Sequence, residues 1–144
     1  MASNTLKVVK IRGDGIRKEA PADSAITPGM LVELLSTGRV QPQSNDAVKV
    51  PMAFALENHL IGGDLDKAYA EDDTVQYEVL PPGAEVNALV KASASAIAVG
   101  VFVEALDDGT VKILAGGVPI GMAMEAVDNS GNSGSMARIR IEVM

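Results

Sequence analysis

The chain has 144 residues and a formal net charge of −7, and 47% of its residues are hydrophobic but only 3% aromatic. This length suits a single domain with its own core, which small and medium aliphatic side chains must fill. The absence of cysteine excludes disulfides and thiolate metal sites. The sequence contains no run of about 18 uncharged apolar residues, so neither a membrane span nor a membrane partner is expected.

The first eighteen residues are predicted to form a basic, extended N-terminal arm. They hold five basic residues and one acidic residue, whereas residues 19–144 hold seven basic and eighteen acidic ones. The acidic body would repel nucleic acid, so no nucleic-acid partner is expected. No aromatic residue interleaves the basic ones, which favours a strand that docks on protein; an ordinary solvated first strand is the alternative. The candidate binding residues are Leu6, Lys7, Val8, Val9, Lys10, Ile11, Arg12, Arg17 and Lys18.

The N-terminus lacks an apolar run followed by a cleavage site, so no secretory signal is expected. Residues 5–12 mix β-branched and basic side chains, which indicates an extended or edge strand. Residues 13–15, Gly-Asp-Gly, end that strand, and residues 16–25 are predicted to be an extended connection.

A repeat dominates the rest of the chain. Residues 24–40 return seventy-one positions later as residues 95–111, with nine identities in seventeen ungapped positions. In each copy a turn with a glycine precedes a short strand, a tight hairpin connection and a return strand. The connection is Ser-Thr-Gly at 36–38 and Asp-Asp-Gly at 107–109. Because only the glycine is kept, the repeat indicates a backbone requirement and not a ligand site.

Further strands are predicted between and after the two copies. Residues 50–56, 75–79 and 85–90 are strand-like, as are 118–127 and the alternating 138–143, while residues 128–135 contain only turn formers. Residues 64–71 are predicted to form one or two helical turns capped by Asp64. Nine or ten short strands at this spacing favour a barrel or a sandwich. We therefore predict a mainly β fold: a compact body of residues 19–144 with two related β-units (24–80 and 95–144), one short helix and the arm 1–18.

Residues that carry chemistry are few. His59 is the only histidine, and the acids at 64, 66 and 71–73 lack the spacing of a calcium loop. Residues 122–126 are faintly similar to a biotin-carrier hairpin, but Ala123 stands where the lysine would be. We expect no catalytic residue, no metal and no cofactor, and the chain is not expected to be an enzyme.

The pattern as a whole resembles the head decoration, or cement, proteins of tailed bacteriophages. It is most similar to those of chi-like siphophages and more distantly similar to the lambda-type trimeric head protein. The resemblance is carried by the basic start, the segment Ala25-Ile26-Thr27-Pro28-Gly29-Met30-Leu31-Val32-Glu33 and its second copy at 96–104, and the two hairpins. The late segment 121–123 with the polar loop and terminal strand also matches. This chain is longer than the lambda-type protein and more basic at its start.

The resemblance implies a β-tulip or small β-barrel body and a homotrimer. It implies a structural virion protein, made in the bacterial cytoplasm, that binds the major capsid protein on the outer surface of the expanded head. There it would cement neighbouring coat subunits against the pressure of packed DNA. A virion-surface module that binds carbohydrate or a host surface is the alternative.

Overall fold

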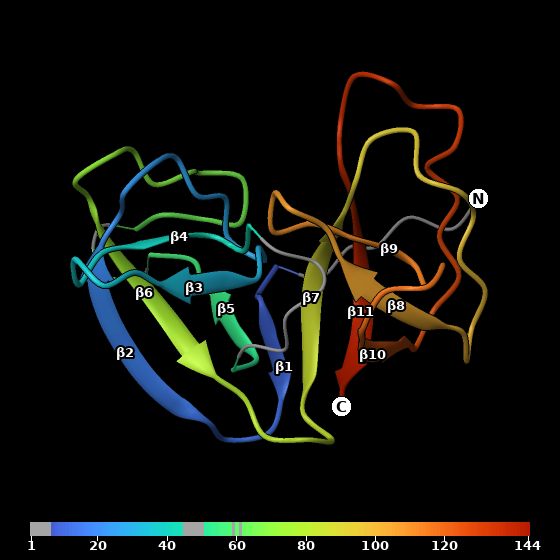
Figure 1. Cartoon of the computed structure of the whole chain (residues 1–144), viewed down its shortest axis with the longest axis horizontal. Coiled ribbons are helices and arrows are strands. Elements are labelled where there is room, and N and C mark those ends of the chain that lie inside the picture. The colour runs from blue at the N-terminus through green and yellow to red at the C-terminus, as the bar shows by residue number, and fades with distance from the viewer. Residues whose placement is uncertain (1–6, 45–50, 59, 61) are drawn as a thin grey trace.

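The computed structural model describes residues 7–44, 51–58, 60 and 62–144. These residues form strands joined by turns and loops, with no helical element, so the predicted all-β class is confirmed for them. In Figure 1 the strands group into two bodies that lie side by side. The strands are β1 (Lys10–Arg12), β2 (Ile16–Pro21), β3 (Val32–Leu34), β4 (Val40–Pro42), β5 (Ala53–Ala55), β6 (Thr74–Val79), β7 (Glu85–Val90), β8 (Phe102–Ala105), β9 (Val111–Ile113), β10 (Pro119–Ala123) and β11 (Ala137–Val143).

The second body, β7–β11, is a closed five-stranded barrel. Its strands follow the order β7-β11-β10-β8-β9, and a parallel pairing of Val90 with Val111 joins the last strand to the first. Alternate residues of these strands point inward, and Val86, Ile139 and Ile141 are fully buried. The expected compact barrel body is therefore present.

The first body, β2–β6, repeats the same strand order in a looser form. β2, β6 and β5 form one sheet, and β3 and β4 form another. An antiparallel bridge from Leu31 to Phe54 joins the two sheets, and a parallel bridge from Ala22 to Val40 stands where Val90 meets Val111 in the second body. We call β2–β6 the first unit and β7–β11 the second unit.

The hydrogen bonds of the two units correspond pair by pair. Gly29 and Gly100 occupy equivalent turns with positive φ, and so do Gly38 and Gly109 in the hairpins. The repeat extends beyond the sequence echo, since it begins at β2 and β7. Five backbone hydrogen bonds of the first unit have an equivalent in the second. In the first unit they run from Ile26 N to Tyr69 O, Gly29 N to Ala55 O, Leu35 N to Arg39 O, Leu56 N to Gln76 O and Leu80 N to Met52 O. In the second unit, in the same order, they run from Ile97 N to Val127 O, Gly100 N to Ala123 O, Leu106 N to Thr110 O, Met124 N to Arg140 O and Met144 N to Ile120 O.

The short helix expected at 64–71 is wrong. Asp64 does cap the local backbone, because its Oδ1 accepts hydrogen bonds from the N–H groups of Asp66 (3.0 Å) and Lys67 (3.1 Å). The chain then extends, since Tyr69 exchanges two backbone hydrogen bonds with Ile26. One turn is too short to hold a helix against this tertiary pairing.

The two units share one large core. Its main cluster combines Leu31, Phe54 and Leu56 of the first unit with the interior of the barrel. A smaller cluster lies inside the first unit alone, around Ile26 and Tyr69. The units are therefore joined by packed apolar surface and not by a bare linker.

Candidate functional site

The predicted N-terminal arm is built into the body from Val9 onward. Leu6 lies outside the described residues. β1 pairs with β7 through Lys10 and Arg12, and the Asn87 N–H donates to the Val9 carbonyl at 2.7 Å. Val9 is fully buried, and its N–H donates to Glu57 Oε2 at 3.0 Å. Residues 10–12 therefore extend the chain's own sheet as its edge strand, and docking of this segment on another protein stays a prediction.

Three of the five cations of this segment face acids of the same chain. Glu78 is buried on β6. Its carboxylate lies 3.3 Å from Lys10 Nζ and 3.8 Å from Arg17 Nε, and it accepts a hydrogen bond from the Gly15 N–H at 3.0 Å. Arg12 Nε lies 3.2 Å from Glu85 Oε2. Glu78 thus holds the β1–β2 connection against the first unit.

The segment still presents positive charge to solvent. Lys7, Arg12, Arg17 and Lys18 are exposed, while Lys10 and Ile11 are half-buried and the Val8 side chain is partly exposed. Lys7 and Lys18 form no ion pair with a described residue. We call these four exposed cations the basic edge. Arg12 lies on β1 and Arg17 and Lys18 lie on β2, so three of these cations are on strands fixed in the body and not on a loose arm.

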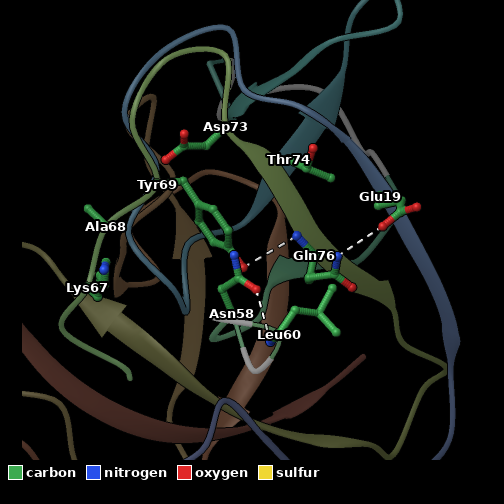
Figure 2. Close-up of a pocket in the computed structure, with 9 residues that line it drawn as sticks. All are labelled: Glu19, Asn58, Leu60, Lys67, Ala68, Tyr69, Asp73, Thr74 and Gln76. Atoms are coloured by element: carbon green, nitrogen blue, oxygen red, sulfur yellow. Dashed lines mark hydrogen bonds between the residues drawn. The ribbon is translucent and has the colours of Figure 1, made fainter. Parts of the chain in front are cut away.

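A polar pocket of about 480 Å³ lies on the first unit, beside β2 and β6. Figure 2 shows Glu19, Tyr69 and Gln76 converging on it. Gln76 Nε2 donates to Glu19 Oε2 at 3.0 Å, and the Tyr69 hydroxyl donates to the Leu56 carbonyl at 2.7 Å. Burial raises the pKa of Tyr69 above its ordinary value. A buried phenol that already donates to the backbone is a structural group and not an acid poised for catalysis.

Sequence reasoning did not find this pocket. Glu19, Asn58 and Thr74 come from strands and loops far apart in the chain, and none belongs to a recognisable motif. Only the pairing of β2 with β6 brings Glu19 to Gln76. No signal in the sequence could have indicated that juxtaposition.

Aromatic side chains offer little for stacking on a sugar. Of the four in the chain, Phe54, Tyr69 and Tyr77 are buried, and Phe102 is 44% exposed. Glycan-binding sites rely on exposed aromatic faces with polar groups beside them. This distribution disfavours the carbohydrate-binding alternative.

Equivalent carboxylates of the two units, the buried Glu104 and the half-buried Glu33, stabilise the hairpins beside them. Glu104 accepts hydrogen bonds from the N–H groups of Ala115 (3.1 Å) and Gly117 (2.7 Å), and its Oε1 lies 3.3 Å from Lys112 Nζ. Burial by itself would raise the pKa of Glu104, but these hydrogen bonds and the lysine together lower it. The equivalent Glu33 is held by Gln41 and Ser44, whose hydrogen bonds likewise outweigh burial and lower its pKa. These acids hold hairpins in place.

The acids singled out in the sequence do not gather into a metal site. Among the described residues no group of three or more histidine, cysteine or acidic side chains is placed to hold a metal ion. His59 lies outside the described residues. In the described part of the chain no helix is long and apolar enough to cross a membrane.

No protein-family model matches the sequence, and no curated protein is similar to it.

Proposed function

We propose that this chain is a structural virion protein that binds the outer surface of the expanded phage head. There it would cement neighbouring subunits of the major capsid protein and stabilise the shell against the pressure of packed DNA. The proposal begins from the resemblance of the sequence to head decoration proteins. The basic edge is the observation that carries it further, because it gives an otherwise acidic body a fixed surface for an acidic coat subunit.

The use of the polar groups supports a brace. Glu57, Glu78 and Glu104 are buried carboxylates, and each accepts a hydrogen bond from a backbone N–H distant in sequence. Carboxylates that accept backbone hydrogen bonds in this way make the fold rigid, and they are not available to act on a substrate. A rigid body suits a clamp, because a clamp that binds only the assembled lattice stabilises that lattice by mass action.

The test uses expanded heads stripped of their decoration protein, incubated with purified protein and imaged by electron microscopy. The wild-type chain should occupy regular positions on the outer surface and raise the temperature at which the heads release DNA. Purified protein that leaves the heads bare would refute the proposal.

Charge substitutions test the surface itself. The variant K7Q/K18Q removes two exposed cations of the basic edge and should weaken binding to heads about tenfold or more at low salt, with a smaller effect at high salt. The matched control S95D/S133D changes the net charge by the same amount at exposed positions of the second unit. Equal binding by the two variants would exclude the basic edge as the attachment surface.

Truncation is not a suitable test of this surface. Removing residues 1–15 would delete β1 and the buried Val9 together with the basic side chains. A loss of binding would then report unfolding as readily as loss of contact.

A further inference from the structure

The two units of the chain contact each other head to tail. The hairpin tip of the second unit lies on the first: the Leu31 N–H donates to the Gly109 carbonyl at 2.9 Å. Gly109 is buried, and a Cβ placed on it would lie 3.1 Å from the Cβ atoms of both Met30 and Pro42. The tip at 107–109 thus fits a surface of the first unit made by the start of β3 and the end of β4.

A second part of the same contact involves the turn that precedes β3. Pro28 and Gly29 are buried against the second unit. Arg138 Nη1 donates to the Pro28 carbonyl at 2.8 Å, and a Cβ on Gly29 would lie 2.8 Å from the Asn87 carbonyl. The turn and strand start of the first unit therefore dock on β7, β11 and the hairpin tip of the second unit.

Because the contact is head to tail, each unit has one contact surface that nothing in the described part of the chain covers. These surfaces are the hairpin tip of the first unit and the turn before β8 in the second unit. The tip of the first unit, residues 36–38, is exposed, and no atom lies within 4 Å of a Cβ placed on Gly38. The turn of the second unit is also bare. Val99 is 65% exposed and Phe102 44%, whereas the equivalent Pro28 is buried and Leu31 only 1% exposed.

The positions that would receive this second turn are likewise uncovered. Glu19, Pro21 and Thr74 of the first unit are equivalent to Asn87, Leu89 and Arg138 of the second, and all three are exposed. Glu19 and Thr74 lie at the polar pocket (Figure 2). The pocket therefore lies where the internal repeat would place a neighbouring turn.

We infer that the free turn of the second unit docks on the free surface of the first unit in another copy of this chain. The Phe102 N–H would donate to the Gly38 carbonyl of the neighbouring copy, as the Leu31 N–H does to Gly109 within one chain. Val99 and Phe102 would lose their exposure, as the equivalent Pro28 and Leu31 of the first unit already have. A heterologous contact of this kind closes into a ring when the rotation permits.

The inference deepens the proposed function, since a ring of three copies would be the expected trimer, with six similar units. The contact itself is argued from the internal repeat and not from the capsid role. Tests on purified protein alone therefore separate the two. A chain that stays single in solution but decorates heads would overturn the ring and leave the capsid role standing.

Disulfide trapping tests the contact directly, because the chain has no cysteine of its own. The variants G38C and V101C are prepared separately, mixed and oxidised, so that a mixed disulfide can form only between copies. In the internal equivalent, a Cβ placed on Gly109 would lie 3.1 Å from the Met30 Cβ, close enough for a disulfide between cysteines at the two positions. G131C, at an open loop glycine, replaces G38C in the control mixture.

We expect the G38C and V101C mixture to yield a two-chain species in at least about tenfold excess over the control. Equal yields would overturn the contact. If G38C does not fold, T37C at the same exposed tip takes its place.

Mass measurement by sedimentation supplies an independent readout. The wild-type chain should form one discrete species of several copies, and Phe102→Glu should convert it to single chains with an unchanged circular dichroism spectrum. Met136→Glu is the control, because Met136 is exposed but lies outside the free turn of the second unit and the free surface of the first unit. It should keep the mass of the wild-type assembly. Single chains at every wild-type concentration, or an assembled Phe102→Glu variant, would overturn the inference; growth without limit would overturn the closed ring.

Discussion

Arg138 links the two units, and its replacement by methionine should destabilise the whole molecule. Its guanidinium donates to the Pro28 carbonyl at 2.8 Å and to the Leu65 carbonyl at 2.7 Å, from β11 to two loops of the first unit. Burial lowers the pKa of Arg138, but an arginine remains protonated throughout the physiological range. Methionine keeps the apolar stem and removes both charged hydrogen bonds.

The magnitude follows from those two bonds. A hydrogen bond to a charged group contributes about 1.5–3 kcal/mol, and the carbonyls left behind lose their partner. We expect the free energy of unfolding to fall by about 3 kcal/mol. With an unfolding entropy near 2 cal/mol/K per residue, the melting temperature should fall by about 10 °C.

Thermal and urea unfolding followed by circular dichroism measures the change. Arg12→Met is the matched control, because the Arg12 side chain is 74% exposed and makes one surface ion pair. That pair should contribute less than about 1 kcal/mol. Equal melting temperatures for Arg138→Met and Arg12→Met would refute the view that the guanidinium joins the units.

Three further predictions concern the body of the protein. Because the pKa of Glu104 is lowered in the folded state, its contribution to stability is complete above the unfolded-state pKa near 4.5 and is lost as the pH falls through the lower folded-state pKa. Glu104→Gln should therefore reduce the drop in urea midpoint between neutral pH and pH 3. The same drop in the variant and the wild type would contradict this. In the Phe102→Glu variant, which is expected to stay a single chain, Gly38→Ala should lower the free energy of unfolding by about 1 kcal/mol because of its positive φ. Gly109→Ala should lower it by at least about twice as much, since its Cβ would also lie 2.8 Å from the Leu31 carbonyl oxygen. Equal losses would mean that the hairpin tip at Gly109 does not pack on the first unit. Val9→Ala should lower the unfolding free energy by about 1–2 kcal/mol and Val8→Ala by little, because Val9 is fully buried and Val8 is 41% exposed; a neutral Val9→Ala would show that β1 is dispensable.

Local patterns in the sequence were enough for the class of the fold and for its hairpins. Glycine at 38 and 109 can adopt the positive φ that the turns require, and alternating apolar residues such as Ile139 and Ile141 face a core. The echo between residues 24–40 and 95–111 indicated a duplicated unit, because identical turn chemistry imposes the same backbone path. These features depend on neighbours along the chain.

Tertiary structure decided what the N-terminal segment and the polar surface do. Basic residues between β-branched ones describe a docking strand equally well whether the partner sheet is foreign or the chain's own, and only the pairing with β7 and the burial of Val9 show which. The start of the repeat at β2 and β7 was also invisible, since Ile16–Pro21 and Glu85–Val90 share backbone geometry but few side chains. A strand's partners are set by the hydrogen bonds that close a sheet, and those bonds join residues whose separation in sequence carries no local signal.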